Sequence, residues 1–159
     1  MENSASIAQA AGATARPRGF TVESANRALV YVAPVMRDVR GCYAAFNRLR
    51  ERRAELSATQ TGGAELDEVQ ARLSEQIERL NELSSELSRV GCEMKDWEVG
   101  LVDFPARYEG RWVCLCWKLG ETQITHWHEW DAGFAGRREV DDAFRAALHA
   151  EFAARSAPR

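Results

Sequence analysis

The stretch that decides the fold runs from Gly91 to Arg137 and reads GCEMKDWEVGLVDFPARYEGRWVCLCWKLGETQITHWHEWDAGFAGR. It contains all five tryptophans, three of the four cysteines and two of the three histidines of the chain. Apolar and polar residues alternate along three parts of it, 99–104, 111–117 and 123–130, with the period of a half-buried strand. We therefore expect a three-stranded antiparallel meander within 97–131, with turns at 105–110 and 118–120.

A long helix is predicted before this stretch, over residues 22–56. Thr21 suits its N-cap, because its hydroxyl can accept a backbone N–H of the first turn. Apolar residues then recur at helical spacing: Leu29, Val32, Met36, Val39, Tyr43, Phe46 and Leu49. Pro34 lies inside the pattern and removes one backbone hydrogen bond, so we expect it to kink or split the helix near Ala33.

A second helix is predicted over 64–90, after a loop at 57–63. Leu66, Leu73, Leu80 and Leu87 lie seven residues apart, which is a coiled-coil spacing, and Gly91 suits the position just past the helix end. The two helices should form an antiparallel hairpin over 21–91. At roughly 1.5 Å per residue the second helix is close to 40 Å long, whereas strands of this size span roughly 25 Å.

The hairpin should therefore overhang the sheet and expose part of its apolar stripe. A second copy could cover that stripe in a four-helix bundle, and a homodimer through the hairpin is the expectation. The alternative is one hairpin whose two stripes cover each other.

The remaining segments complete an α+β fold. Val140, Phe144, Leu148 and Phe152 lie four apart and predict a last helix over 139–155. Residues 1–18 are small and polar, and we expect a disordered tail before a single domain at 19–159.

Composition excludes several classes of protein. The net charge of -3 and the pI of 5.7 argue against a general nucleic-acid binder, which should present a basic face. No apolar run approaches the roughly 20 residues that span a bilayer, and the N-terminus lacks the pattern of a signal peptide. We expect a cytoplasmic protein whose four cysteines are thiols, with no cofactor and no membrane partner.

Metal binding is the first chemistry that the strands suggest. Cys114 and Cys116, and likewise His126 and His128, are two residues apart, so each pair shares one face of a strand. A three-residue turn at 118–120, with Gly120 taking positive φ, would put both pairs on the same face of the sheet, whereas a two-residue turn would put them on opposite faces. Glycine at the third turn position favours the three-residue turn. Both cysteines could equally be small core residues.

An acid–base or ligand site is the second hypothesis, built from Asp103, Arg111, Glu121 and His128. His128 is a side chain whose ordinary pKa lies near neutrality, and Arg137 could clamp an anion. In the competing interpretation Asp103 pairs with Arg111 across the first hairpin and the site is structural.

The aromatic residues give a third possibility, a stacking platform or protein-binding face formed by Tyr108, Trp112, Trp117, Trp127 and Trp130. Core packing competes with it. We expect Trp112 and Trp130 in the core and leave Trp117 and Trp127 open.

Five stretches together resemble the DUF2203 family of small bacterial proteins: FTVESAN (20–26), GCEMKD (91–96), GLVDFPA (100–106), LCWKLGE (115–121) and WHEWDAGFAGR (127–137). The resemblance implies a bacterial source, a helical hairpin joined to a sheet, and no assigned reaction. It singles out Asp103, Glu121, His128 and Arg137 as motif positions. The chain departs from the family at His126, where an aromatic or variable residue is usual, which weakens any mechanism that needs both histidines.

Two functions follow as hypotheses. The first is a non-enzymatic interaction or ligand-binding module that self-associates through its hairpin and presents the sheet to a protein or small ligand. Its candidate ligand residues are Asp103, Arg111, Glu121, Trp127, His128 and Arg137. The second is a small enzyme or metal-dependent protein that uses Asp103, Glu121 and His128.

Overall fold

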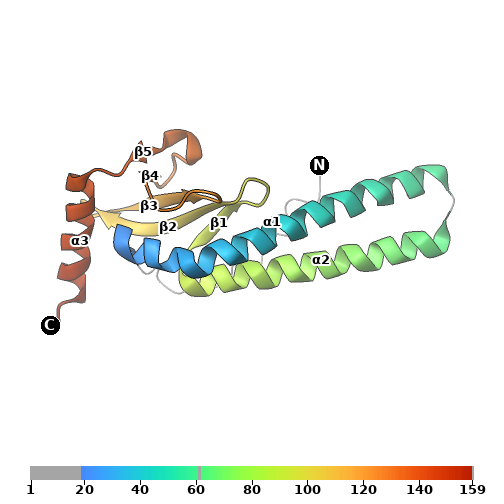
Figure 1. The fold of residues 1–159 in the computed structure, drawn as a ribbon, viewed down its shortest axis with the longest axis horizontal. Coiled ribbons are helices and arrows are strands. Elements are labelled where there is room, and N and C mark those ends of the chain that lie inside the picture. The colour runs from blue at the N-terminus through green and yellow to red at the C-terminus, as the bar shows by residue number, and fades with distance from the viewer. Residues whose placement is uncertain (1–18, 61, 159) are drawn as a thin grey trace.

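A computed structural model of the chain describes residues 19–60 and 62–158, and it has an α+β fold (Figure 1). Two long helices are followed by a five-stranded antiparallel sheet and a C-terminal helix. The elements are α1 (Val22–Thr59), α2 (Gly63–Val90), β1 (Glu93–Asp96), β2 (Leu101–Tyr108), β3 (Arg111–Lys118), β4 (His126–Glu129), the short 3-10 helix η2 (Phe134–Gly136), β5 (Arg138–Glu139) and α3 (Asp142–Ser156). The tail expected at 1–18 lies outside the described residues.

The hairpin forms because its ends carry strong local signals. Thr21 caps α1 in a reciprocal pair, since its hydroxyl accepts from the Ser24 backbone and Ser24 accepts from the Thr21 backbone. Gly91 ends α2 in the left-handed conformation, with φ of 100°. The helices are longer than predicted and leave only 60–62 between them. Pro34 does not split α1, which continues through it as one α-helix.

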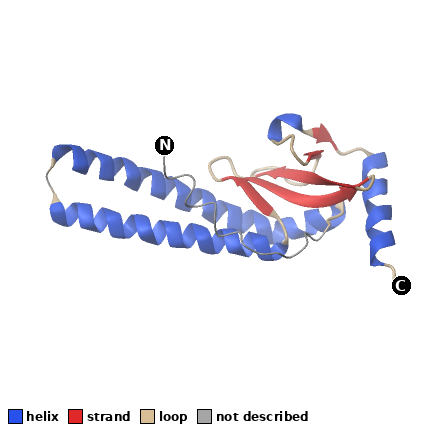
Figure 2. Ribbon diagram, turned by 180° about the vertical axis from the view of Figure 1, so that it is seen from behind, coloured by secondary structure: helices blue, strands red, loops and turns tan. Residues whose placement is uncertain are grey.

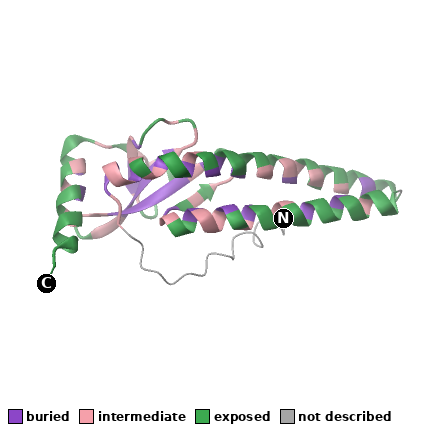
Figure 3. Ribbon diagram, turned by 60° about the horizontal axis from the view of Figure 1, so that its bottom comes forward, coloured by how far each residue is buried: buried purple, intermediate pink, exposed green. Residues whose placement is uncertain are grey.

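The hairpin overhangs the sheet as the sequence predicts, and its leucine stripe is covered within one chain (Figures 1 and 3). Leu73, Leu80 and Leu87 of α2 are buried. No large apolar residue between 32 and 60 or between 62 and 90 is among the exposed ones. The two helices therefore cover each other's stripes in a single chain, which is the alternative that the sequence left open.

The sheet has five strands in the order β1-β2-β3-β4-β5, so the prediction of three strands is wrong (Figure 2). The two additional strands are short edge elements. β1 has four residues and a register shift between Met94 and Asp96, and β5 has only two residues. A period of two cannot be recognised in so few residues, because their strand conformation depends on pairing with a neighbour.

The pairing of β3 with β4 keeps the predicted parity but differs in register. A turn at 118–120 would have placed Cys114 opposite Ile124, whereas the structure places Cys114 opposite His128. The extra residues leave the sheet, and the Ile124 backbone N–H donates to Asn26 of α1 at 2.7 Å. Because the difference is an even number of residues, every side chain of β4 stays on its predicted face.

The two faces of the sheet have different covers. One face packs on the hairpin and contributes Val102, Phe104, Val113, Leu115 and Trp117 to the core. α3 stands at one end of this layer, where Phe144 stacks on Trp127 with ring centroids 4.4 Å apart (Figure 1). The opposite face carries Asp103, Cys114, Cys116 and His128, and the segment 130–137 lies over part of it.

The last helix begins later than predicted. Asp141 accepts from the Phe144 backbone and caps α3, which therefore starts at Asp142. Residues 138–139 belong to β5 instead, because they pair with His126 and Trp127 of β4. Phe152 is 44 % exposed, so the predicted apolar stripe of this helix is only partly used.

Candidate functional site

Three adjacent strands bring a carboxylate, a thiol and an imidazole together on the sheet face away from the hairpin. They are Asp103 of β2, Cys114 of β3 and His128 of β4, which are 5 %, 4 % and 1 % exposed. One donor atom from each lies within 4.8 Å of the donor atoms of the other two. This is the candidate site, and it is far more buried than acidic and imidazole side chains usually are.

The His128 ring is held by both of its nitrogen atoms. Nδ1 lies 2.7 Å from the Glu129 carbonyl oxygen, which can only accept, so Nδ1 carries a proton and donates it. Nε2 lies 3.1 Å from Oδ1 of Asp103. In a neutral imidazole this Nε2 bears a lone pair, which would face a carboxylate oxygen. A proton or a metal cation must therefore lie between these two atoms.

The two thiols beside this pair are uncharged in the metal-free protein. Burial, together with the Asp103 charge, raises the pKa of Cys114 and of Cys116 to about 12. Cys116 pairs with Asp103 in the sheet register and lies one side chain away from Cys114 on the same face. Only a cation close to the sulfur atoms would favour their thiolate forms near neutral pH.

A pocket of about 220 Å³ opens onto this site from the side of the 130–137 segment. Its lining includes Asp103, Cys116 and His128 together with Lys95, Asp131 and Phe134. Trp130 stands at its edge and is 47 % exposed, so the expectation that Trp130 belongs to the core is wrong. The pocket has room for a small ligand beside the buried donors.

The four residues of the sequence-predicted metal set share one face, with Cys114 opposite His128 and Cys116 opposite His126. His126 does not join the buried cluster. Its Nδ1 lies 2.9 Å from the Thr125 hydroxyl, and Asp103 takes the place that the sequence hypothesis gave to His126.

Glu121 and Arg137 form a second polar pair, separate from the cluster. Arg137 donates to both Glu121 carboxylate oxygens, at 2.9 and 3.0 Å, and to the Cys116 carbonyl at 3.1 Å. Burial acts to raise the pKa of Glu121, but the hydrogen bonds from Arg137 and from the Lys118 backbone outweigh it and lower that pKa. The catalytic set of Asp103, Glu121 and His128 is thus not assembled in one pocket.

Arg111 and Trp127 lie on the opposite face of the sheet. Arg111 makes a two-pronged contact with Glu129, at 2.8 and 3.0 Å, rather than the pair with Asp103 that the sequence suggested. Trp127 is 6 % exposed and stacks on Phe144. Trp127 is therefore a structural neighbour of α3, and neither residue is part of the candidate site.

Sequence reasoning missed the residues that border the pocket, above all Lys95, Asp131 and Phe134. They come from an irregular edge strand and from the loop after β4. The only sequence signal was the glycine-bearing stretch DAGFAG, which begins three residues after His128 and in which Gly133 has φ of 63°. Glycine adopts such a positive φ readily and is therefore favoured where the chain turns tightly.

Comparison with known proteins assigns no activity. A family model described as an uncharacterized conserved protein, DUF2203, matches residues 18–140. No curated protein and no solved structure matches the chain. Within the described part of the chain, no helix has both the length and the apolar character needed to cross a membrane.

Proposed function

This chain belongs to the DUF2203 family, whose description names no activity, and we propose that it binds a transition metal ion of the Zn²⁺ class through Asp103, Cys114 and His128. One observation carries the proposal: three buried donor atoms from three adjacent strands lie within 4.8 Å of one another. Tetrahedral zinc sites place ligand atoms roughly 3.3–3.8 Å apart, so small side-chain movements would close the cluster around an ion.

The donor set favours this class of ion over hard cations. Mg²⁺ and Ca²⁺ select oxygen ligands, whereas thiolate and imidazole are typical ligands of zinc and its transition-metal neighbours. The Asp103 carboxylate supplies the remaining donor and a negative charge. A divalent ion would also remove the lone-pair conflict between Nε2 of His128 and Asp103, which lie 3.1 Å apart.

The surroundings of His128 support the same proposal. Metal-binding histidines usually donate their second N–H to a carbonyl or carboxylate, which fixes the ring and its tautomer. Here Nδ1 donates to the Glu129 carbonyl at 2.7 Å and directs Nε2 toward Asp103. The imidazole is thus pre-oriented as a ligand.

The pocket decides what the ion would do. With three protein ligands, the fourth position would face the pocket of about 220 Å³ and take water or a small ligand. With Cys116 as a fourth ligand the site would be closed and structural. Thiol ligands require a reducing compartment, so the bacterial cytoplasm expected from the sequence is part of this proposal.

Metal content and cobalt spectroscopy test the proposal. Purified untagged protein, stripped with chelator and reloaded, should take up one Zn²⁺ or Co²⁺ per chain. The Co²⁺ form should show a sulfur-to-metal charge-transfer band in the near ultraviolet, because Cys114 supplies a thiolate.

Matched cysteine variants provide the control. Cys114→Ser should lose the charge-transfer band and most of the metal affinity, and Asp103→Asn and His128→Gln should also lose affinity. Cys92→Ser removes a thiol that is equally buried but outside the cluster, and it should bind normally. Absence of stoichiometric metal, or equal binding by Cys114→Ser and Cys92→Ser, would overturn the proposal.

Proton release separates the open site from the closed one. Each thiol ligand must lose its proton on binding, because its pKa in the metal-free protein is about 12. Calorimetry in buffers of different ionisation enthalpy counts these protons. Cys116→Ser should release as many protons as the unmodified protein if the site is open, and one fewer if Cys116 is a ligand.

Self-association through the hairpin is a separate proposal, and charge rather than apolar surface would drive it. α1 carries seven arginines and four acidic residues, a net charge of +3, and α2 carries three arginines and seven acidic residues, a net charge of -4. A two-fold pair of hairpins side by side would place each α1 against the partner's α2. Sedimentation at micromolar concentration should show a salt-sensitive dimer; a monomer at low salt contradicts the proposal.

A further inference from the structure

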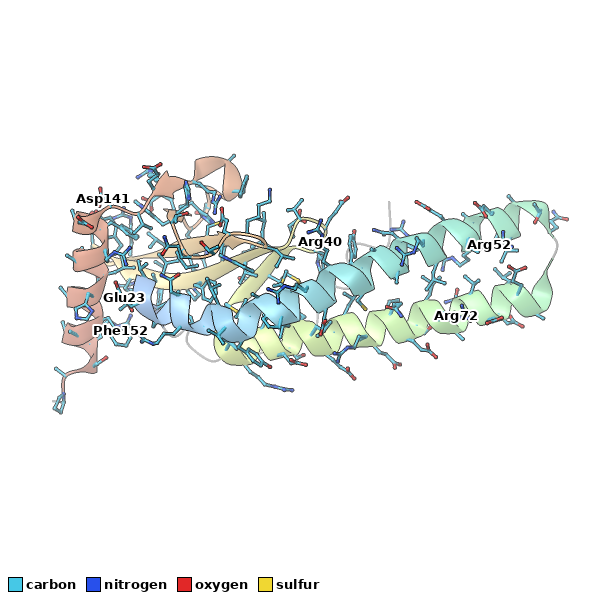
Figure 4. All side chains as sticks on the ribbon, viewed as in Figure 1. Glu23, Arg40, Arg52, Arg72, Asp141 and Phe152 are labelled. Atoms are coloured by element: carbon cyan, nitrogen blue, oxygen red, sulfur yellow. The ribbon has the colours of Figure 1, made fainter. Side chains whose placement is uncertain are left out.

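A second hollow lies on the hairpin side of the sheet, between α1 and the turn that follows β3. It is a groove of about 590 Å³. α1 contributes the residues at 26, 29, 30, 33, 37 and 40, and the turn contributes those at 119–122. Arg40 is labelled in Figure 4, on the part of α1 that passes the end of the sheet. The groove and the candidate metal site are on opposite sides of β3, since Trp117 lines the one and Cys116 the other.

The floor and one wall of the groove are apolar. Trp117 and Leu29 are buried beneath it, and Ala33 and Leu119 are partly buried. Val30 is 83 % exposed, the largest exposure among the large apolar residues of the described chain. An apolar body lying in the groove would cover this valine.

The far end of the groove carries two arginines without partners. Arg37 and Arg40 make no hydrogen bond or ion pair with any described residue, whereas Arg52 of the same helix pairs with Glu55 and Glu65. Residues three apart on a helix are neighbours on its surface, so both guanidinium groups can reach one bound group. Two guanidinium groups that converge in this way match a carboxylate or phosphate.

The other polar groups of the groove do not oppose an anion. Glu121 is the only acidic residue among its lining residues, and its carboxylate already accepts from Arg137 and from the Lys118 backbone. Asn26 accepts from Ile124 through Oδ1, and its amide nitrogen donates to no described residue. The unsatisfied polar groups of the side chains that line the groove are therefore mainly donors.

We propose that this groove binds a small organic anion with an apolar body. Arg37 and Arg40 hold its carboxylate or phosphate, and Val30, Ala33 and Leu29 contact the body. The volume lies within the range of roughly 300–1,000 Å³ that is usual for small-molecule pockets. The site uses none of the residues proposed to bind metal.

Anilinonaphthalene sulfonate, a fluorescent anion with an apolar body, is the first probe. It should bind the whole chain saturably, and Arg37→Gln/Arg40→Gln should weaken binding by about tenfold or more, because hydrogen bonds to charged groups are lost. Both arginines are exposed on the helix, so the variant should keep its circular dichroism spectrum. Arg27→Gln/Arg48→Gln is the matched control: it removes two arginines of α1 that pair with no described residue and do not line the groove.

Competition identifies the acid group. Naphthoate and naphthyl phosphate should displace the probe, and neutral naphthol should be at least about tenfold weaker. The stronger of the two acids tells whether the natural ligand carries a carboxylate or a phosphate. Cys114→Ser should bind the probe unchanged, which keeps this test independent of the metal proposal.

Three results would overturn the proposal. They are no saturable binding of the probe, equal binding by Arg37→Gln/Arg40→Gln and the unmodified chain, and displacement by naphthol as strong as by the acids. The second and third would mean that the probe binds apolar surface alone.

Discussion

The two faces of the sheet both carry buried side chains but differ in chemistry. Toward the hairpin, Phe104, Leu115 and Trp117 are at most 1 % exposed and belong to the apolar core. The indole N–H of Trp117 donates to the Glu121 carbonyl. Away from the hairpin, Asp103 and His128 are 5 % and 1 % exposed and polar. The same strands supply both sets, because successive residues of a strand point to opposite faces.

The difference separates packing from binding. Apolar burial stabilises the fold, whereas burying a carboxylate and an imidazole costs free energy unless each is satisfied. A sheet that needed only a second cover could have used apolar residues on both faces. The buried polar set is the basis of the metal proposal, and the comparison predicts that substitutions on the hairpin face change packing, whereas those on the other face change ion binding.

Loss of a large side chain from the hairpin face should give the largest effect. Trp117→Ala should lower the free energy of unfolding by about 3–5 kcal/mol, since it leaves a cavity in the core. Trp130→Ala, on the other face and 47 % exposed, should lower it by less than about 1 kcal/mol. Urea denaturation of the two variants measures both values. Equal losses would show that the two faces are packed alike.

Metal binding at the polar face should give the second-largest change in the free energy of unfolding. At a free Zn²⁺ concentration 100 times the dissociation constant, the free energy of unfolding should rise by about 2.7 kcal/mol. Cys114→Ser should show no rise and Cys92→Ser the full rise. Thermal melts with chelator and with Zn²⁺ give the comparison. If Zn²⁺ still stabilises Cys114→Ser, the ion does not bind at this face.

Loss of the Arg137 side chain, which connects the two faces, should have an intermediate effect on the free energy of unfolding. Arg137 donates to Glu121 beside the groove and to the Cys116 carbonyl beside the candidate site. Arg137→Met removes a donor from each of these acceptors and should cost about 1–3 kcal/mol of unfolding free energy. The neighbouring Arg138→Met is the control, because the Arg138 side chain is 61 % exposed. Equal stabilities of the two variants would show that this link is not structural.

Alkaline pH should give the smallest change in the free energy of unfolding, counted for each thiol and each pH unit. In the folded, metal-free protein the pKa of Cys114 and Cys116 is about 12, whereas the ordinary value is 9.0. Between these values the unfolded chain loses the thiol protons and the folded chain keeps them. The contribution of these thiols to stability should therefore be constant below pH 9 and fall above it, by about 1.4 kcal/mol per thiol for each pH unit.

Chemical denaturation with chelator at several pH values tests this slope. Cys92, whose pKa is also about 12, adds to it in every variant that keeps that residue. Cys114→Ser/Cys116→Ser should therefore retain a shallower decline. An unchanged slope in this double variant would show that the two thiols are not shielded by burial.

Much of the fold was predictable because its signals are local. Thr21 and Gly91 mark helix ends through their own backbone chemistry, and the leucine spacing of α2 repeats over nearly four heptads. The edge strands β1 and β5 were missed, since neither contains enough alternation to be recognised. Pro34 lies on the surface of α1, where a missing hydrogen bond is tolerated without ending the helix.

The candidate site was predictable only in part. Residue parity placed Cys114 and His128 on one face, because any even register shift preserves it. The choice of Asp103 over His126 was not predictable, since Asp103 lies level with Cys116 and His126 in the register and meets Cys114 and His128 only diagonally across the sheet. The association of Glu121 with Arg137 depends on how the segments 119–125 and 130–137 leave the sheet.

The sequence by itself determined the helical hairpin, the change to strands after Gly91 and the alternation of residues between two faces within each main strand. These follow from side-chain periodicity and from the capping of helix ends, which depend on residues close together in the sequence. Tertiary structure alone decided that Asp103, Cys114 and His128 meet, and that Arg37 and Arg40 line a groove. Those neighbours are far apart along the chain, and only the pairing of strands and the packing of α1 against a distant turn bring them together.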